Sequence, residues 1–484
     1  MIMIGRMLSN RKLLIGAILA SLIFRCFLIA EVAMHPDRAM QGDAGHYDFL
    51  ARQLLENHRF WGPSMFLGSS DPAATFKGLV FEAPGAAPGE GPMPEGFRTP
   101  GYPVFLTAVR AVSGHQILVL LVIQTLLVML IGWMLFRICT LYASSSVGWL
   151  AVALFAWNCE FLELPNLMLT ETLFGALLVL ATWCVLLFAE RGVMRHLVFA
   201  GIAVGLAALC RPAATYFAAA LVPVILWSGR RQWRRAVAGS MILLSVCAIT
   251  MAPWLARNKA VFGRARLAAV EGLNLYLYNT AFLDAKDHGT SWTVERRRLS
   301  LDLQSAIDAQ HLNPLEASDV AKDRAIERIS RDPVGYGKVH AKGMVMMLVA
   351  NSFRGVYTLA TGHGYESGSP IDALSRTGSV PAAVKAFMGA LSPVTAILLV
   401  ILLLRVVLML AALRGFWHLL RQSPALAIAC VVTVGYYLVI TGPLGIDPRF
   451  RAPLIPALTI LAAVGIGRTF AVAFGLIRRA PATD

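Results

Sequence analysis

Two short motifs, 55 residues apart, carry the side chains best suited to chemistry. The first covers residues 42–48 (GDAGHYD) and the second covers residues 97–103 (FRTPGYP). A carboxylate such as Asp43 can take a proton from an attacking hydroxyl group, and an arginine such as Arg98 makes paired contacts with phosphate. Each motif also has a structural interpretation, because Asp43 suits a helix N-cap and Arg98 suits a membrane interface.

Two further motifs place polar side chains where apolar stretches begin or end. Glu171 follows Thr170 at the start of one stretch, where an N-cap and a functional carboxylate fit equally well. Arg257 and Asn258 follow Pro253-Trp254 at the end of another stretch. Tryptophan and arginine are normal anchors at a membrane interface, so this second motif favours anchoring.

The elements that must hold these side chains are membrane-spanning helices. The chain has 484 residues, 57% hydrophobic and 15% charged, whereas a soluble chain has roughly a quarter charged residues. Its apolar runs approach the ~20 residues that a spanning helix needs. We expect an all-α polytopic protein with about 10–13 spans, ten of them clear: 13–33, 116–136, 146–162, 167–189, 197–210, 213–229, 236–256, 388–412, 423–441 and 452–475.

The basic residues set the orientation. The net charge of +15 lies in short clusters between apolar runs rather than on one face, so no nucleic-acid partner is expected. Short loops rich in Lys and Arg mark the cytoplasmic side. We therefore expect a cytoplasmic N-terminus and two long outer loops, 34–115 and 257–337. The stretch 339–353 must then lie along the membrane or re-enter it.

The outer loops carry structure of their own. Apolar residues at spacings of three and four predict an amphipathic surface helix over 43–57. Residues 83–96 are rich in Pro and Gly and predict a flexible segment. Residues 294–331 predict one or two charged helices, with Asn313-Pro314 as the break between them.

The last outer motif is Asp447-Pro448-Arg449-Phe450-Arg451, at the outer end of the final span. The positive-inside rule does not explain two arginines on the outer side. We therefore interpret Arg449 and Arg451 as candidates for binding phosphate.

Several kinds of site are not indicated. The sequence has no HExxH, P-loop or GxSxG pattern. Its seven cysteines form no CxxC and read as small buried residues. No cofactor is required by the sequence, and dependence on a divalent metal stays open.

The order of the motifs resembles the GT-C superfamily of integral-membrane glycosyltransferases. It is most similar to the branch with protein mannosyltransferases, aminoarabinose transferase and lipid A core galacturonosyltransferases. The resemblance covers most of the chain and rests on short motifs in order: Asp43 with Tyr47, Arg98 with Pro100 and Tyr102, Thr170-Glu171, Arg211-Pro212, Pro253-Trp254 with Arg257-Asn258, and Arg449-Phe450-Arg451.

The resemblance implies a reaction and roles for residues. A sugar would pass, with inversion, from a polyprenyl-phosphate donor to a lipid, glycan or protein acceptor at the outer face. Asp43 would be the general base, and Arg98, assisted by Arg449 and Arg451, would hold the donor phosphate. Ala44 stands where several relatives have a second acid, so that role falls to Asp48 or Glu171. Further possible substrate contacts are Tyr47, Tyr102, Arg257 and Asn258.

The resemblance also implies a setting, and alternatives remain. We expect one domain, residues 1–475, in a bacterial inner membrane in contact with its lipids, and a cytoplasmic tail, 476–484. A transporter or flippase of lipid-linked saccharides would need charges deep inside spans, and here these are few, Arg25 and Arg405. A non-catalytic assembly protein would not need a coherent set of outer charges.

Overall fold

The computed structural model describes residues 11–62, 93–114, 116–349, 352–364, 381, 384–385, 393–443 and 447–473. Most of the Pro/Gly-rich segment and the whole of the expected tail lie outside these residues. The regular elements of the described chain are helices and one ribbon of two short strands, β1 (Trp61–Gly62) and β2 (Met93–Pro94).

Seven helical segments of the described chain are long and apolar enough to cross a membrane. They are α2 (Arg11–Met34), α5 (Ile117–Tyr142), α8 (Glu171–Arg191), α11 (Trp233–Phe262), α20 (Pro393–Gln422), α21 (Pro424–Thr441), and α22 (Ile455–Ala473) together with η6 (Pro448–Leu454) before it. The protein is therefore multi-pass and all-α in its membrane part, as the sequence predicts.

The other three expected spans are less regular. Helix α6 (Ser145–Ala156) is followed by α7 (Cys159–Glu163) and η2 (Leu164–Asn166) at a bend of 63°, and this pair would make an eighth span. Helices α9 (Arg195–Cys210) and α10 (Phe217–Ser228) have 16 and 12 residues. Both are shorter than the ~20 residues of an ordinary span.

The bend between α6 and α7 explains one charge inside the membrane. Asn158 caps α7 by accepting a hydrogen bond from the Phe161 N–H. Arg25 of α2 donates to the carbonyl oxygens of Ala156 and Phe161, at 2.9 and 2.5 Å. In lipid such carbonyls must find a partner within the protein. Arg25 thus provides hydrogen-bond donors for the backbone carbonyl groups at the bend.

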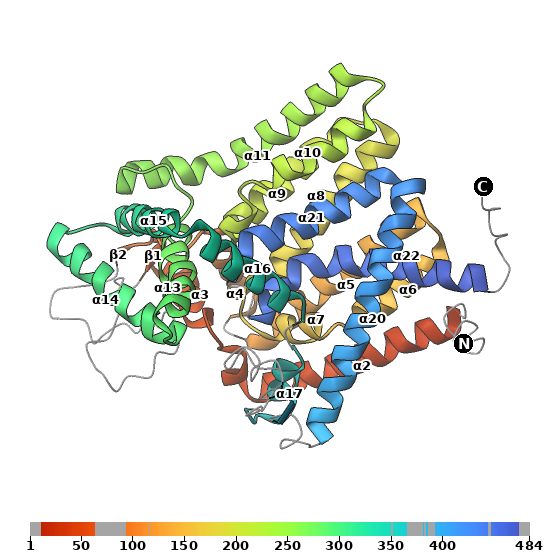
Figure 1. The fold of residues 1–484 in the computed structure, drawn as a ribbon, viewed down its shortest axis with the longest axis horizontal. Coiled ribbons are helices and arrows are strands. Elements are labelled where there is room, and N and C mark those ends of the chain that lie inside the picture. The colour runs from red at the N-terminus through yellow and green to blue at the C-terminus, as the bar shows by residue number, and fades with distance from the viewer. Residues whose placement is uncertain are drawn as a thin grey trace.

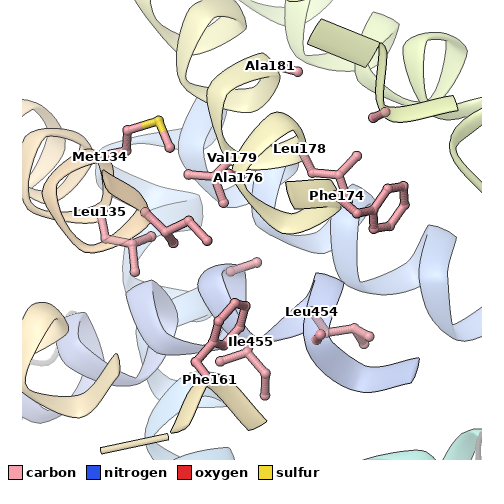
Figure 2. Close-up of a cluster of buried hydrophobic side chains, with 14 of the residues drawn as sticks. Met134, Leu135, Phe161, Phe174, Ala176, Leu178, Val179, Ala181, Leu454 and Ile455 are labelled. Atoms are coloured by element: carbon pink, nitrogen blue, oxygen red, sulfur yellow. The ribbon is translucent and has the colours of Figure 1, made fainter. Parts of the chain in front are cut away.

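The largest hydrophobic core packs around η6, which carries the motif at residues 447–451. Figure 2 shows side chains of α5, α7, α8 and the η6–α22 junction pointing toward one another. Phe161 of α7 is fully buried, and Leu454 at the end of η6 is equally enclosed. This packing fixes η6 against the bundle.

The described helices of the two segments expected on the outer side, 34–115 and 257–337 (the outer segments below), gather at one end of the bundle, away from the start of α2 and the end of α22 (Figure 1). The predicted surface helix is α3 (Ala44–Asn57), and α4 (Gly101–Ser113) packs against it. The second outer segment contains α12 (Val270–Asn274), a π-helical turn η4 (Leu275–Thr280), α13 (Ala281–His288), α14 (Trp292–Gln310) and α15 (Pro314–Arg331). The predicted break is confirmed, since Asn313 forms a capping box at the start of α15.

The stretch 339–353 begins inside one helix, and a second helix starts at its last residue. They are α16 (Pro333–Val349) and α17 (Phe353–Thr361). Neither is among the candidate spans of the described chain.

The two outer segments share a second, smaller core. Phe97 is buried there together with Phe262, Leu273 and Leu315. The Ala269 N–H donates to the Gly96 carbonyl over 2.9 Å. The residue before Arg98 is therefore held by the second outer segment.

Candidate functional site

Asp43 stands at the N-cap position of α3 and serves as an ion-pair partner instead of a cap. Among the described residues of α3, no first-turn N–H donates to its carboxylate. Arg98 Nη2 lies 2.6 Å from Asp43 Oδ1, and Arg449 Nη1 lies 3.5 Å from Oδ2. The carboxylate is 28% exposed. The capping interpretation of Asp43 is thus not what the geometry shows.

The arginines control the charge of this carboxylate. Burial raises the pKa of Asp43, but Arg98, Arg449 and Arg211 together outweigh burial and bring the pKa below its usual range. Burial lowers the pKa of Arg98, and the carboxylate of Asp43 more than reverses this effect. Asp43 and Arg98 are therefore both charged at neutral pH.

The guanidinium group of Arg98 lies against two aromatic rings. Its guanidinium carbon lies 4.6 Å from the ring centre of Phe97 and 5.2 Å from that of Tyr47. Its Nε lies 3.5 Å from Nδ1 of His46, and its backbone N–H donates to Glu95 over 2.8 Å. Arg98 Nη1 has no hydrogen-bond partner in the part of the chain that the structure describes.

Arg449 reaches Asp43 from the other end of the chain. Asp447 caps η6 by accepting from the Arg449 N–H, and its Oδ2 lies 3.0 Å from Arg449 Nε. Gly42, just before Asp43, has φ of 57°, and a Cβ there would lie 3.3 Å from Arg449 Nη1. Glycine suits both the left-handed turn and the close approach.

A second ion pair borders the first. Glu171 Oε1 accepts from Arg211 Nη1 at 2.5 Å, and Thr170 at the N-cap position makes no side-chain cap to the described helix α8. The Arg211 guanidinium lies 5.4 Å from the ring centre of Phe450. Burial raises the pKa of Tyr47 to about 12, with Arg98 opposing. Tyr47 therefore keeps its phenolic proton.

Other candidates point elsewhere. Asp48 pairs with Arg110 and with Arg52, the latter over 2.8 Å. The Tyr102 hydroxyl donates to Gln124 Oε1 over 3.2 Å, although its ring touches Tyr47. These contacts hold α3 and α4 in place.

Arg257 and Asn258 near the end of α11 also make structural contacts. Arg257 Nη1 donates to the Glu95 carbonyl over 2.6 Å, and Asn258 Nδ2 donates to the Arg266 carbonyl over 2.7 Å. They link α11 to backbone of both outer segments. The structure thus shows backbone contacts where the sequence suggested possible contacts with substrate.

Arg451 does not join Arg449 at Asp43. Its side chain is 1% exposed and is paired with Glu160 of α7. It also donates to Ser352 Oγ over 2.8 Å and to the Met347 carbonyl over 2.5 Å. Arg405 Nη2 approaches the same Glu160 oxygen, at 3.4 Å. These contacts replace the phosphate contact suggested for Arg451, because its donors are turned into the protein.

Three residues at the site were not singled out as site residues from the sequence. Arg211 was visible only as part of Arg211-Pro212, and His46 only as a letter in the first motif. Glu95 was one of several acids in the first outer loop. Only folding shows that they meet Glu171, Arg98 and Asp43. Over the described residues, no group of three or more His, Cys, Asp or Glu side chains could hold a metal ion.

Comparison with known proteins gives one family match. Residues 97–256 match the family model described as dolichyl-phosphate-mannose-protein mannosyltransferase. The match begins just before Arg98, and it confirms the resemblance to GT-C membrane glycosyltransferases. Asp43 and Arg449 lie outside the matched range. The comparison with curated proteins found no match.

Two solved structures are similar over nearly the whole chain. One is the archaeal oligosaccharyltransferase AglB from Archaeoglobus fulgidus in complex with an inhibitory peptide and a dolichol-phosphate, at 12% identity and a TM-score of 0.48. The other is the apo form of the Archaeoglobus fulgidus oligosaccharyltransferase, at 12% identity and a TM-score of 0.47. They match over 97% and 96% of this chain, which spans only 52% and 53% of theirs, about half.

Proposed function

We propose that the chain is an inverting glycosyltransferase that uses a polyprenyl-phosphate-linked sugar. The observation that carries the proposal is the single carboxylate of Asp43 between two guanidinium groups. Arg98 and Arg449 come from positions 55 and 406 residues further along the chain. A base beside a phosphate clamp is what transfer from a lipid phosphate to a hydroxyl requires.

The proposed step uses these residues as follows. Arg98 and Arg449 bind the donor phosphate and fix the sugar next to Asp43. The acceptor oxygen attacks the anomeric carbon, and Asp43 takes the acceptor proton. The bond from that carbon to the phosphate oxygen breaks, and its electron pair leaves with the phosphate. The two arginines stabilise the added negative charge on the leaving polyprenyl phosphate.

The ion pairs in the substrate-free site determine which substrate acts first. Asp43 is a weak base while both arginines hold its pKa down. A donor phosphate competes for the same guanidinium groups, and Asp43 becomes more basic as they turn to it. Donor binding thus precedes activation of the acceptor.

The setting belongs to the same proposal. Residues 1–475 form one catalytic domain, and residues 476–484 a tail on the cytoplasmic side. The site faces the outer side of a bacterial inner membrane, at the depth of the lipid headgroups, and takes a lipid, glycan or protein acceptor. The described helices of both segments expected on the outer side lie at one end of the bundle, which supports this placement (Figure 1). Arg25 and Arg405 contact protein groups, which favours the enzyme over a transporter.

The test compares envelope lipids and glycoproteins by mass spectrometry in cells with and without the gene. A sugar-sized mass difference on one acceptor class identifies the product. Asp43→Asn should abolish it, by a factor of about 10²–10⁴ for loss of a general base. The matched control is Asp37→Asn, which changes an exposed acid of the same loop. Full product from Asp43→Asn would remove Asp43 as the base.

A further inference from the structure

We infer that Glu95 and His46 are positioning residues, which set the orientation of Arg98 for the donor phosphate. The ligand in this inference, a polyprenyl phosphate, comes from the proposed function. The inference adds which residues orient Arg98 toward that phosphate. The four side chains form a continuous line in the order Glu95, His46, Arg98 and Asp43. Glu95, His46 and Arg98 are each at most 9% exposed.

Glu95 begins the line and is fixed on both oxygens. Its Oε1 accepts from the N–H groups of Phe97 and Arg98, at 2.5 and 2.8 Å, so it shapes the turn that carries Arg98. Its Oε2 lies 2.9 Å from His46 Nε2. Burial raises the pKa of Glu95, whereas the hydrogen bonds from His46 and from these backbone N–H groups lower it. Glu95 is therefore an acceptor only.

These contacts select one form of His46. An ionised Glu95 can only accept a hydrogen bond from Nε2, so Nε2 carries hydrogen. Arg98 Nε always carries hydrogen and faces Nδ1 at 3.5 Å, so Nδ1 must be the acceptor. His46 is thus the neutral tautomer with its proton on Nε2. A carboxylate behind an imidazole commonly fixes a tautomer in this way.

The line decides which edge of Arg98 meets the phosphate. Arg98 donates from Nε to His46 and from Nη2 to Asp43, and the rings of Tyr47 and Phe97 lie against its guanidinium group. Nη1 is the nitrogen that remains without a partner in the described chain. When phosphate displaces Asp43 from Nη2, Arg98 presents Nη1 and Nη2 as one bidentate edge. Without His46 the guanidinium could rotate and lose this presentation.

The test measures binding of a short-chain polyprenyl phosphate to the purified protein in detergent. His46→Gln reaches toward Glu95 but lacks an acceptor at the Nδ1 position, whereas His46→Asn places an amide oxygen near that position. We expect His46→Gln and Glu95→Gln to weaken binding about tenfold, the low end for loss of such a supporting partner. His46→Asn should stay near wild type. Glu56→Gln, an exposed acid of α3, is the matched control.

The outcomes separate this inference from the proposed function. If Arg98→Ala leaves polyprenyl-phosphate binding unchanged, the proposed phosphate clamp fails. If Arg98→Ala weakens binding but His46→Gln equals His46→Asn, the positioning role is wrong. A purely structural tie to Glu95 would instead favour His46→Gln over His46→Asn. Nitrogen-15 spectra of histidine-labelled protein give a second readout, since a protonated Nδ1 on His46 would overturn the inference.

Discussion

Arg98 Nη2 lies 2.6 Å from Oδ1 of Asp43, although the two residues come from opposite ends of the first outer segment. The pair joins a candidate base to a candidate phosphate ligand. Each group occupies the position that the other's substrate would need. In this arrangement the ion pair must open before the proposed base and the proposed phosphate ligand can both meet a substrate.

This pairing predicts that Asp43→Asn binds polyprenyl phosphate more tightly while losing transfer. The substitution frees Arg98 and Arg449 and removes a negative charge beside the phosphate. A partly exposed ion pair is worth roughly 0.2–1 kcal/mol, so we expect about a threefold lower Kd. Titration of the purified variant measures it. Weaker binding would mean that Asp43 helps to hold the phosphate.

The same pairing predicts a stability effect that depends on pH. The pKa of Asp43 is lower in the folded protein than in the unfolded chain, so its stabilising effect is present above its unfolded pKa of about 3.9. The effect is lost as pH falls through the folded value. The Tm of Asp43→Asn should lie below that of the wild type by a constant gap from pH 8 to 5. The gap should narrow below about pH 4, and a gap that grew there would reverse the sign.

Glu160 and Arg451 should behave as a coupled pair. Removing one partner of a buried ion pair leaves an uncompensated charge and costs about 3–5 kcal/mol, whereas replacing both costs much less. Glu160→Gln and Arg451→Met should each lower Tm strongly. The double variant should be more stable than Glu160→Gln, because one of the two arginines on Glu160 is gone. Additive losses in a thermal-shift series would show that they act independently.

Gly62 offers a backbone test of the Glu95 contact. A Cβ on Gly62 would clash with Glu95 Oε2, so Gly62→Ala must displace that carboxylate. We expect it to weaken polyprenyl-phosphate binding about tenfold, like Glu95→Gln. Gly337→Ala on α16 is the control, because its Cβ would meet nothing within 4 Å. Equal affinities in the two variants would contradict the expectation.

The sequence predicts the helices of this protein better than the tertiary contacts between them. Apolar runs place ten helical segments, and the spacing of apolar residues places α3. Asn313-Pro314 carries its own cap signal, so the break before α15 is local information. By contrast, residues 146–162 read as one run, although the chain bends there and distant Arg25 donates to a carbonyl group at the bend.

Arg449 and Arg451 show why the site was only partly predictable. They are two residues apart on a 3₁₀ segment, where each residue turns the side chain by about 120°. They therefore project in different directions, one to Asp43 and the other to Glu160. Which of them faces the outer site depends on how η6 rotates against α7 and α8. That rotation is set by tertiary packing and leaves no mark in the motif itself.

The dispersal of the site along the chain also bears on biosynthesis. Asp43 emerges early, Arg98 is anchored through Phe97 to a core completed only by α15, and Arg449 arrives with the final helix pair. A nascent chain halted before η6 would expose Asp43 and Arg98 without the second guanidinium. A chain that ends before η6 should thus be inactive, so the proposed activity would require insertion at least as far as Arg449.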